Sequence, residues 1–319
     1  MVQLELDVLH GMARSALNEW DLNVAKIELE TVSENTVFRV VTADAEKYVL
    51  RVHRPGYHTF EELKSERMWT KALNATGISA PVPKHARDGR DYVEVPVPGS
   101  NETRYIGIAH WIEGIPLASI LENEKDETII IDYFHQLGNF AATIHDQSSA
   151  WTIPPGFTRH ALDADGLMGD TPFWGPFWES PELTVAEREL VITARDNIHQ
   201  ILSDLGKDRE SYGMIHADLH PRNVLMNGDS VSIIDFDDAG FGFHLYELAV
   251  ALFYDQSLPW FPPARDALLK GYRSRRPLDQ TAEELLPVFL LARALAALGW
   301  LQDRPEHKTE ERVRNLIKM

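Results

Sequence analysis

The chain has no cysteine among its 319 residues. This absence excludes disulfide bonds and thiol chemistry, and it fits a reducing compartment. Basic residues are also few, because 31 Lys and Arg stand against 49 Asp and Glu, which gives a formal net charge of −18. Such a charge argues against nucleic acid or an anionic membrane as the main partner. It is compatible with a cationic substrate, although excess acid more often serves solubility.

Long apolar runs are missing as well. The most apolar segment, residues 285–301, is interrupted by Pro287 and Arg293 and is short for a membrane span, so we expect a buried helix. Asp7, His10 and Arg14 lie where a signal peptide needs an apolar run. We therefore expect a cytoplasmic protein, with one large or two moderate domains for 36.2 kDa.

The stretch 214–238 carries the clearest chemical signal. Asp218 follows His216 by two places, Asn223 follows Asp218 by five, and Asp235 ends an apolar run. These residue types suit phosphoryl transfer, in which the protein orients an acceptor hydroxyl and holds cations against the phosphates. A carboxylate near the hydroxyl takes its proton, while an amide oxygen and a second carboxylate bind Mg²⁺. Asp218 suits the first task, and Asn223 and Asp235 suit the second.

The local pattern predicts how these groups meet. Residues 223–226 and 231–234 are typical of two short strands around the turn-rich link 227–230, and such a hairpin places Asp235 beside Asn223. Two other interpretations remain: a zinc centre of His216, Asp218 and His220, or a structural role in which the aspartates cap turns. Neither of them accounts for Asn223.

Residues 216–223, together with Asp235-Phe-Asp237, resemble the signature of the aminoglycoside phosphotransferase and choline kinase-like family of the protein kinase-like superfamily. The spacing also matches the kinase catalytic loop and metal-binding aspartate. The resemblance implies an α+β, two-lobed protein kinase-like fold with an N-terminal antiparallel sheet and helix and a mainly helical C-terminal lobe. It implies a nucleotide-binding lobe over residues 1–110, a catalytic and substrate-binding lobe over residues 111–319, and ATP and Mg²⁺ as cofactors.

The N-terminal region fits the sheet that this resemblance implies. Residues 27–31, 36–41 and 47–52 have strand character. The loop 32–36 occupies the place of the phosphate-covering loop, where Ser33 and Asn35 are the expected phosphate contacts. It lacks a glycine-rich pattern, so an ordinary polar hairpin is the alternative.

Arg51 stands where the resembled family has a lysine on the third strand. The resemblance implies that Arg51 contacts the phosphates, although a guanidinium is not equivalent to an ammonium. A capped helix over residues 59–73 carries Glu66, the expected partner of Arg51, with Glu62 as the competing candidate. Solvent exposure of the arginine or the glutamate is the alternative.

Strands are expected over residues 92–97 and 104–109. The segment 110–114 after them resembles the family's hinge between lobes, and the resemblance implies that backbone groups near His110 and Ile112 read the adenine edge. Beyond it, the segment 172–178 carries four aromatic residues between helix breakers. It is either a substrate lid that holds an ammonium by cation–π contact or a loop anchored by buried rings.

The chain from Asp238 to the apolar helix predicted over residues 244–254 is short. It leaves little room for the activation segment of protein kinases, which favours a small-molecule acceptor. Glu247 is expected to brace the catalytic loop, and Asp255 and Trp260 are candidate acceptor contacts.

The sequence therefore predicts an ATP-dependent kinase whose acceptor is a small alcohol: an amino alcohol, a hydroxy amino acid or an aminoglycoside-like molecule. A protein Ser/Thr kinase and a non-catalytic nucleotide-binding regulator are the alternatives.

Overall fold

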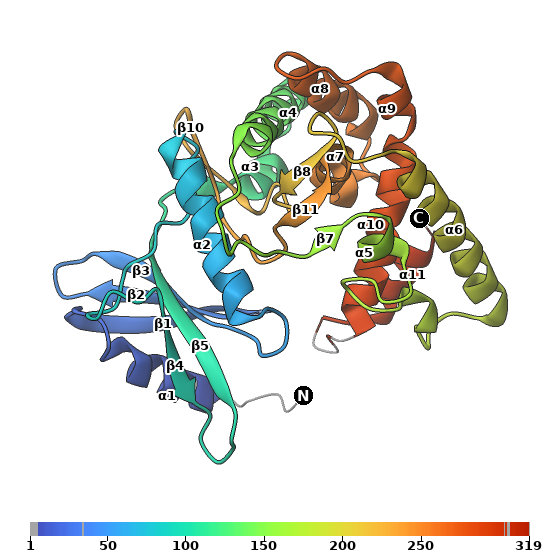
Figure 1. Cartoon of the computed structure of the whole chain (residues 1–319). Coiled ribbons are helices and arrows are strands. Elements are labelled where there is room, and N and C mark those ends of the chain that lie inside the picture. Colours follow the sequence, from blue (N-terminus) through green and yellow to red (C-terminus); the bar gives the residue numbers. More distant parts are fainter. Residues whose placement is uncertain (1–5, 34, 303, 305–306, 319) are drawn as a thin grey trace. The chain divides into compact units, whose positions relative to one another are not determined.

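The computed structural model describes residues 6–33, 35–302, 304 and 307–318. The chain forms two units (Figure 1). The first contains the residues up to Gly114 together with Ile153–Thr158 and Asn227–Asp237, and the second contains Ile115–Thr152, Arg159–Met226 and the residues from Asp238 onward. The units are not consecutive stretches, because the chain returns twice to the first. The predicted lobes, residues 1–110 and 111–319, are defined by their functions and stay a prediction.

A five-stranded antiparallel sheet forms the centre of the first unit. Its strand order is β1-β2-β3-β5-β4, and the strands are β1 Val24–Val32, β2 Thr36–Thr42, β3 Lys47–Val52, β4 Tyr92–Pro96 and β5 Thr103–His110. Buried and less buried residues alternate along β2 and β3, as a sheet with one face in a hydrophobic core requires. All five strands predicted from the sequence are present.

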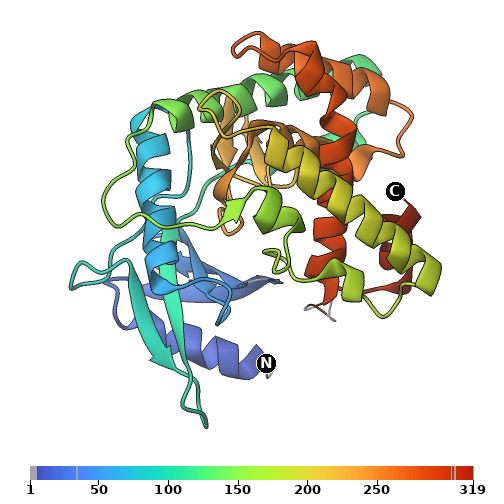
Figure 2. The same cartoon turned by 45° about the vertical axis from the view of Figure 1, so that its right-hand side comes forward.

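Two helices accompany this sheet. Helix α1, Leu6–Leu17, packs Met12, Ala13 and Ala16 into a core shared with Phe38 and Leu50 of the sheet. Helix α2, Phe60–Ala75, lies on the other side of the sheet (Figure 2).

The start of α2 is fixed by the predicted capping box. Thr59 Oγ1 accepts a hydrogen bond from the Glu62 amide at 3.2 Å, and Glu62 Oε2 accepts one from the Thr59 amide at 2.8 Å. Because both groups belong to the first turn, they set the point at which α2 begins and so the positions of the residues further along it.

Strand β10, Ser230–Ile233, also belongs to the first unit. The Ile233 amide donates to the Ser79 carbonyl oxygen at 3.0 Å, and the Ser232 and Ser79 hydroxyls are 2.8 Å apart. These contacts fix the end of β10 and the residues Asp235 to Asp237 that follow it.

The second unit is mainly helical. Its helices are α3 Leu117–Asn123, α4 Glu127–Ala150, α5 Ala164–Met168, α6 Val185–Asp204, α7 His244–Leu252, α8 Phe261–Arg273, α9 Gln280–Glu284, α10 Leu286–Gln302 and α11 Glu310–Lys318, with 3₁₀ turns at Phe177–Glu179 and Phe253–Asp255.

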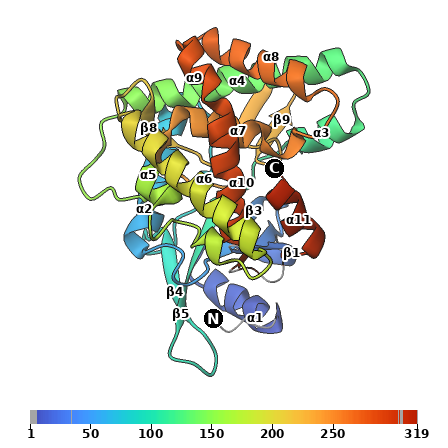
Figure 3. The same ribbon diagram turned by 90° about the vertical axis from the view of Figure 1, so that its right-hand side faces the viewer.

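Helices α4 and α8 run side by side (Figure 3). A Cβ atom on Gly138 would lie 1.9 Å from the Leu268 carbonyl oxygen, and one on Gly271 would lie 1.9 Å from that of His135. Only glycine permits this approach, because any side chain would collide with the facing backbone. Helix α10 is largely buried, which confirms the prediction for residues 285–301, and no helix within the described residues is long and apolar enough to cross a membrane.

Two small sheets in the second unit position the catalytic loop. Strand β11, Gly240–Phe243, lies between β7, Ala161–Leu162, and β8, Tyr212–Ile215; β6, Ile115–Pro116, pairs with β9, Val224–Asn227. From the sequence, residues 239–243 are expected only as a short connection to the next helix. The glycines of β11 are required by close neighbours: a Cβ on Gly242 would lie 2.5 Å from a side-chain carbon of Ile215.

Candidate active site

The catalytic loop follows β8 and is held by one buried carboxylate. Glu247, on α7, accepts hydrogen bonds from the His216 amide at 2.8 Å and the Ala217 amide at 2.7 Å. Ala217 has a φ of 64°, a left-handed conformation that costs about 1 kcal/mol or more for a residue other than glycine. Burial raises the pKa of Glu247, against the two amide donors. The predicted bracing role of Glu247 is confirmed.

Asp218 lies at the end of this strained turn, and both its carboxylate oxygens are engaged. Arg293 Nη2 donates to Oδ1 at 2.7 Å, Asn223 Nδ2 donates to Oδ2 at 2.8 Å, and His220 Nε2 lies 3.2 Å from Oδ2. Burial alone would raise the pKa of Asp218, but His220, Arg293 and His216 outweigh it and hold the pKa well below its usual range. The carboxylate is therefore ionised at neutral pH and accepts hydrogen bonds.

A weakly basic carboxylate suits phosphoryl transfer. The transition state is loose, so the attacking hydroxyl needs little activation before the bond to phosphorus forms. Asp218 can orient that hydroxyl throughout and take its proton late. This arrangement supports the predicted catalytic role, which stays a prediction.

Asn223 is fixed by the same aspartate. Its amide nitrogen donates to the Asp218 carbonyl oxygen at 2.9 Å as well as to Oδ2. With the nitrogen used in this way, Oδ1 is the atom that the side chain can offer to a metal ion, and an amide oxygen is a ligand that Mg²⁺ accepts.

The alternative of a zinc centre finds no support in this loop. The Asp218 amide donates to His216 Nδ1 at 3.3 Å, so this nitrogen has a role within the turn. Within the described residues, His216, Asp218 and His220 do not bring their ligand atoms within reach of one common ion.

Arg293 is the residue of this site that the sequence did not assign. It lies on α10, 75 positions beyond Asp218, and its side chain is only 8% exposed. The available signal was a lone charge inside the apolar run 285–301, because a charge in a buried helix requires a partner.

The aromatic segment 172–178 is built into the second unit. Trp174 and Phe177 are buried, and the Trp174 ring lies 5.6 Å from the Arg293 guanidinium. Trp178 lies 4.4 Å from the guanidinium of Arg195. These rings therefore meet arginines of the chain itself, which favours the anchored loop over a lid that binds a substrate ammonium.

The predicted acceptor contacts lie beyond α7. The rings of His220 and Tyr254 are 5.4 Å apart, and Tyr254 is half-exposed. Burial raises the pKa of the neighbouring Asp255 to about 6, opposed by the charges of His220 and Arg222. The ring of Trp260 instead packs against Phe134, with 5.4 Å between the ring centres, which makes Trp260 a weaker candidate for an acceptor contact.

In the first unit, Arg51 is surrounded by carboxylates. It lies 3.3 Å from Asp235, 3.5 Å from Asp237 and 3.6 Å from Glu66. Burial would lower the pKa of Arg51, but the three acids outweigh it and raise that pKa. The predicted ion pair between Arg51 and Glu66 is therefore present. The alternative of a solvent-facing arginine is wrong, because the Arg51 side chain is only 14% exposed.

Asp235 has a φ of 69° and a side chain that is 45% exposed. A left-handed aspartate immediately after a strand is a strained feature of the kind that gathers at functional sites. Its exposed carboxylate can take a metal ion. Asn223 lies in the other unit, so the predicted convergence of these two ligands stays a prediction.

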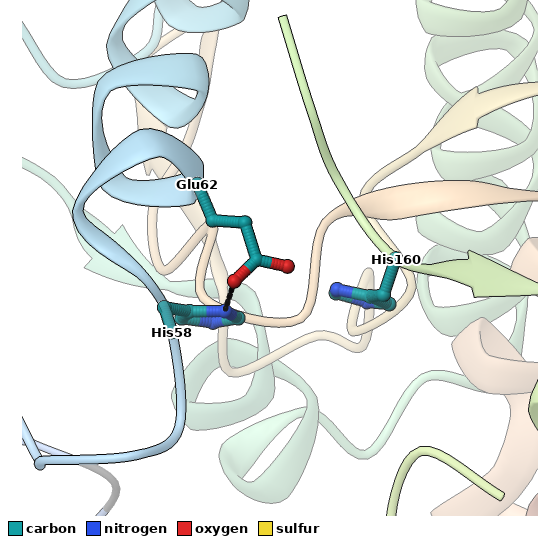
Figure 4. A group of neighbouring side chains, drawn as sticks. All are labelled: His58, Glu62 and His160. Atoms are coloured by element: carbon teal, nitrogen blue, oxygen red, sulfur yellow. Dashed lines mark ion pairs between the residues drawn. The ribbon is translucent and has the colours of Figure 1, made fainter.

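Asp237 joins several parts of the first unit and was not given a role from the sequence. Its carboxylate accepts from Asn35 Nδ2 and pairs with Arg51 at 3.5 Å, and its carbonyl oxygen lies 2.7 Å from His58 Nε2. Glu62 faces Nδ1 of His58 at 3.9 Å (Figure 4). Glu62 is thus occupied at the start of α2, and Glu66 is the partner of Arg51.

The loop between β1 and β2 is turned by a hydrogen bond from the Ser33 amide to the Asn35 carbonyl oxygen at 2.9 Å. The side chain of Asn35 accepts from the Arg54 amide at 3.2 Å and donates to Asp237. The Asn35 side-chain nitrogen could donate to a phosphate only if its hydrogen bond to Asp237 broke. Residue 34, in the same loop, lies outside the described residues.

At the end of β5, the His110 amide donates to the Val82 carbonyl oxygen at 2.9 Å, and the Trp111 amide donates to that of Lys47 at 3.1 Å. The His110 amide is therefore unavailable to an adenine edge unless the bond to Val82 opens. The half-buried Ile112 is the better placed of the two predicted hinge contacts.

Comparison with known proteins agrees with this geometry. Residues 28–287, more than half of the chain, match the phosphotransferase enzyme family. The chain belongs to this family. Its relatives include amicoumacin kinase of Bacillus subtilis, 24% identical over 280 residues that cover 84% of this chain and 77% of the relative. Homoserine kinase of Rhizobium johnstonii is 29% identical over 230 residues, which cover 70% of this chain and 63% of the relative.

Solved structures of kinases with small-molecule substrates have a similar fold. A microcompartment-associated aminopropanol kinase superposes with a TM-score of 0.83 and 31% identity, over 97% of this chain and 93% of that one. An amicoumacin kinase in complex with AMP-PNP and Ca²⁺ superposes with a TM-score of 0.78 over 99% of this chain and 92% of that chain. Because its sequence is only 17% identical, this similarity bears on the fold alone. The predicted kinase-like fold is confirmed, and the protein is a phosphotransferase that acts on hydroxyl groups of small molecules.

Proposed function

We propose that the protein transfers the γ-phosphoryl group of Mg·ATP to the hydroxyl of a small amino alcohol in the cytoplasm. The observation that carries this proposal is the 31% identity to an aminopropanol kinase over 97% of the chain. This likeness covers nearly the whole chain at an identity that bears on more than the fold.

The acceptor side of the second unit supports a cationic substrate. Asp255 is half-buried, and no side-chain hydrogen bond to it is found among the described residues. A carboxylate with a raised pKa becomes fully ionised when an ammonium approaches it, because an opposite charge favours the charged form. Asp255 is the proposed contact for the substrate ammonium, and the half-exposed ring of Tyr254 offers a cation–π face.

The other roles are assigned residue by residue. Asp218 orients and deprotonates the hydroxyl, and Asn223 and Asp235 are the oxygen ligands for Mg²⁺. Arg51 contacts the phosphates and is positioned by Glu66, to which it is paired at 3.6 Å. Ser33 and Asn35, in the phosphate-covering loop, contact the phosphates. Backbone groups at His110 and Ile112 bind adenine, with Ile112 as the stronger candidate.

Steady-state kinetics with a matched set of acceptors test this proposal. ADP release is measured with 1-amino-2-propanol, 3-amino-1-propanol, the deaminated analogue 2-propanol, and homoserine. We expect an amino alcohol to exceed 2-propanol in kcat/KM by about 100-fold, since a desolvated ion pair contributes about 3 kcal/mol.

D255N is the matched variant for this test. It should raise KM for the amino alcohol and leave the weak turnover of 2-propanol unchanged. Preference for homoserine over both amino alcohols would contradict the proposed acceptor class, and phosphate appearing only on added protein would favour the protein-kinase alternative.

A further inference from the structure

We propose that Arg293 is a positioning residue, which fixes the carboxylate of Asp218 so that the acceptor hydroxyl binds at Oδ1, beside the guanidinium. This inference rests on the proposed phosphotransfer to a small alcohol. It also gives the aromatic segment 172–178 a task, because that segment holds the helix from which Arg293 extends.

The carboxylate of Asp218 has a limited number of acceptor positions. An ionised aspartate has about four lone-pair positions, two on each oxygen. Oδ2 accepts from Asn223 Nδ2 at 2.8 Å and also faces His220 Nε2 at 3.2 Å, so it is crowded by two nitrogen groups. At Oδ1 only Arg293 Nη2 is found within the described residues, at 2.7 Å. The remaining position for a substrate hydroxyl is therefore on Oδ1.

Arg293 is itself held from two sides. It is 7% exposed, and the ring of the buried Trp174 lies 5.6 Å from its guanidinium. One face of α10 approaches the aromatic segment closely, because a Cβ on Gly299 would lie 2.8 Å from the Trp174 carbonyl oxygen. The segment thus limits the movement of both the helix and the guanidinium.

The consequence for the reaction follows from this placement. The hydroxyl donates its proton to Oδ1 while its oxygen forms a bond to the γ-phosphorus, and the bond between that phosphorus and the β,γ-bridging oxygen breaks to release ADP. Arg293 keeps the carboxylate from rotating, so the hydroxyl enters the reaction already aligned. Alignment of this kind acts on kcat, whereas nucleotide affinity depends on other residues.

The test combines substitution with chemical rescue. R293A should lower kcat for the amino alcohol by about 10- to 100-fold, since a hydrogen bond to a charged group contributes about 1.5–3 kcal/mol. KM for ATP should change by less than about threefold. R293K should recover part of kcat, and free guanidinium at millimolar concentration should raise the kcat of R293A by about fivefold or more.

R276A is the matched control. Arg276 is also a buried arginine of the second unit, but it pairs with Asp146 at 2.9 Å. Its replacement should reduce thermal stability without a response of kcat to guanidinium. If R293A does not fold, R293Q keeps the side-chain bulk and undergoes the same comparison.

Three outcomes separate the claims. Wild-type turnover together with an R293A kcat within twofold of wild type would overturn this inference alone. A loss of kcat that neither lysine nor guanidinium relieves would also overturn it, because a purely structural arginine behaves in that way. Absence of wild-type turnover with every small alcohol would overturn the proposed function itself.

Discussion

The centres of the two units have opposite charge arrangements. In the first unit a single cation, Arg51, lies within 3.6 Å of three carboxylates. In the second unit a single carboxylate, Asp218, is contacted by the cation Arg293, by the amide of Asn223 and by His220. The first centre thus gathers acids around one guanidinium, and the second gathers hydrogen-bond donors around one carboxylate.

This difference assigns a task to each centre. Clustered carboxylates attract cations, so the first centre is suited to a divalent metal ion. A compensated carboxylate is a weak base that still accepts a hydrogen bond, so the second centre is suited to the orientation of a hydroxyl. Substitutions at the two centres should therefore differ in kind.

The largest effect is expected for D218N, which removes the charge at the second centre. It should lower kcat by about 10²- to 10⁴-fold, because it removes the proton acceptor and places an NH₂ group where Oδ2 accepts from Asn223. The affinity for ATP should stay within about twofold of wild type by titration calorimetry. If D218N weakened nucleotide binding and left kcat unchanged, Asp218 would have a role in nucleotide binding and not in catalysis.

R51M removes the cation of the first centre and should lower the free energy of unfolding by about 3 kcal/mol, since three carboxylates lose the guanidinium that lies within 3.6 Å of them. Added Mg²⁺ should raise the Tm of R51M more than that of wild type, because a divalent ion can replace the missing positive charge. R39M is the control, since Arg39 forms partly exposed pairs with Glu28 and Glu30. Equal Mg²⁺ shifts in R51M and wild type would show that these acids do not attract the metal.

E247Q tests the support of the second centre. A glutamine offers one acceptor oxygen in place of two, so the amide of either His216 or Ala217 loses its partner. We expect a loss of about 2 kcal/mol in the free energy of unfolding, the cost of a buried unsatisfied donor. Denaturant titration measures it, with the exposed E122Q as control. A loss no larger than that of E122Q would remove Glu247 from its bracing role.

Much of the fold was predictable from local patterns. The strands of the first unit follow their alternation and α2 follows its capping box, whereas the roles expected for Glu66 and Glu247 came from the family resemblance. The link between Arg293 and Asp218 was not predictable, because 75 residues separate them and no periodicity connects them. The same holds for Asn35 and Asp237, which are 202 residues apart. Such pairs depend on tertiary packing, which a single sequence does not encode by spacing.

The smallest effect is expected for D255N and depends on pH. The folded-state pKa of Asp255 is raised to about 6 from an ordinary 3.8, so the native state binds more protons than the unfolded state between these values. Its contribution to stability is present below pH 4 and is lost as pH rises through 6. D255N should therefore raise Tm at pH 7.5, by an amount equivalent to about 1 kcal/mol after solvent screening, and have little effect at pH 4. An equal change in Tm at pH 4 and pH 7.5 would contradict the raised pKa of Asp255.

The most direct test of the account is ³¹P NMR of the purified protein with Mg·ATP and a pool of amino alcohols, hydroxy amino acids and aminoglycosides, with D218A as the control. The account predicts a new phosphomonoester signal that is absent from the D218A sample, and division of the pool should trace it to an amino alcohol. Nucleotide binding without a new signal would contradict phosphotransfer to these acceptors, and an equal signal from D218A would contradict the catalytic role of Asp218.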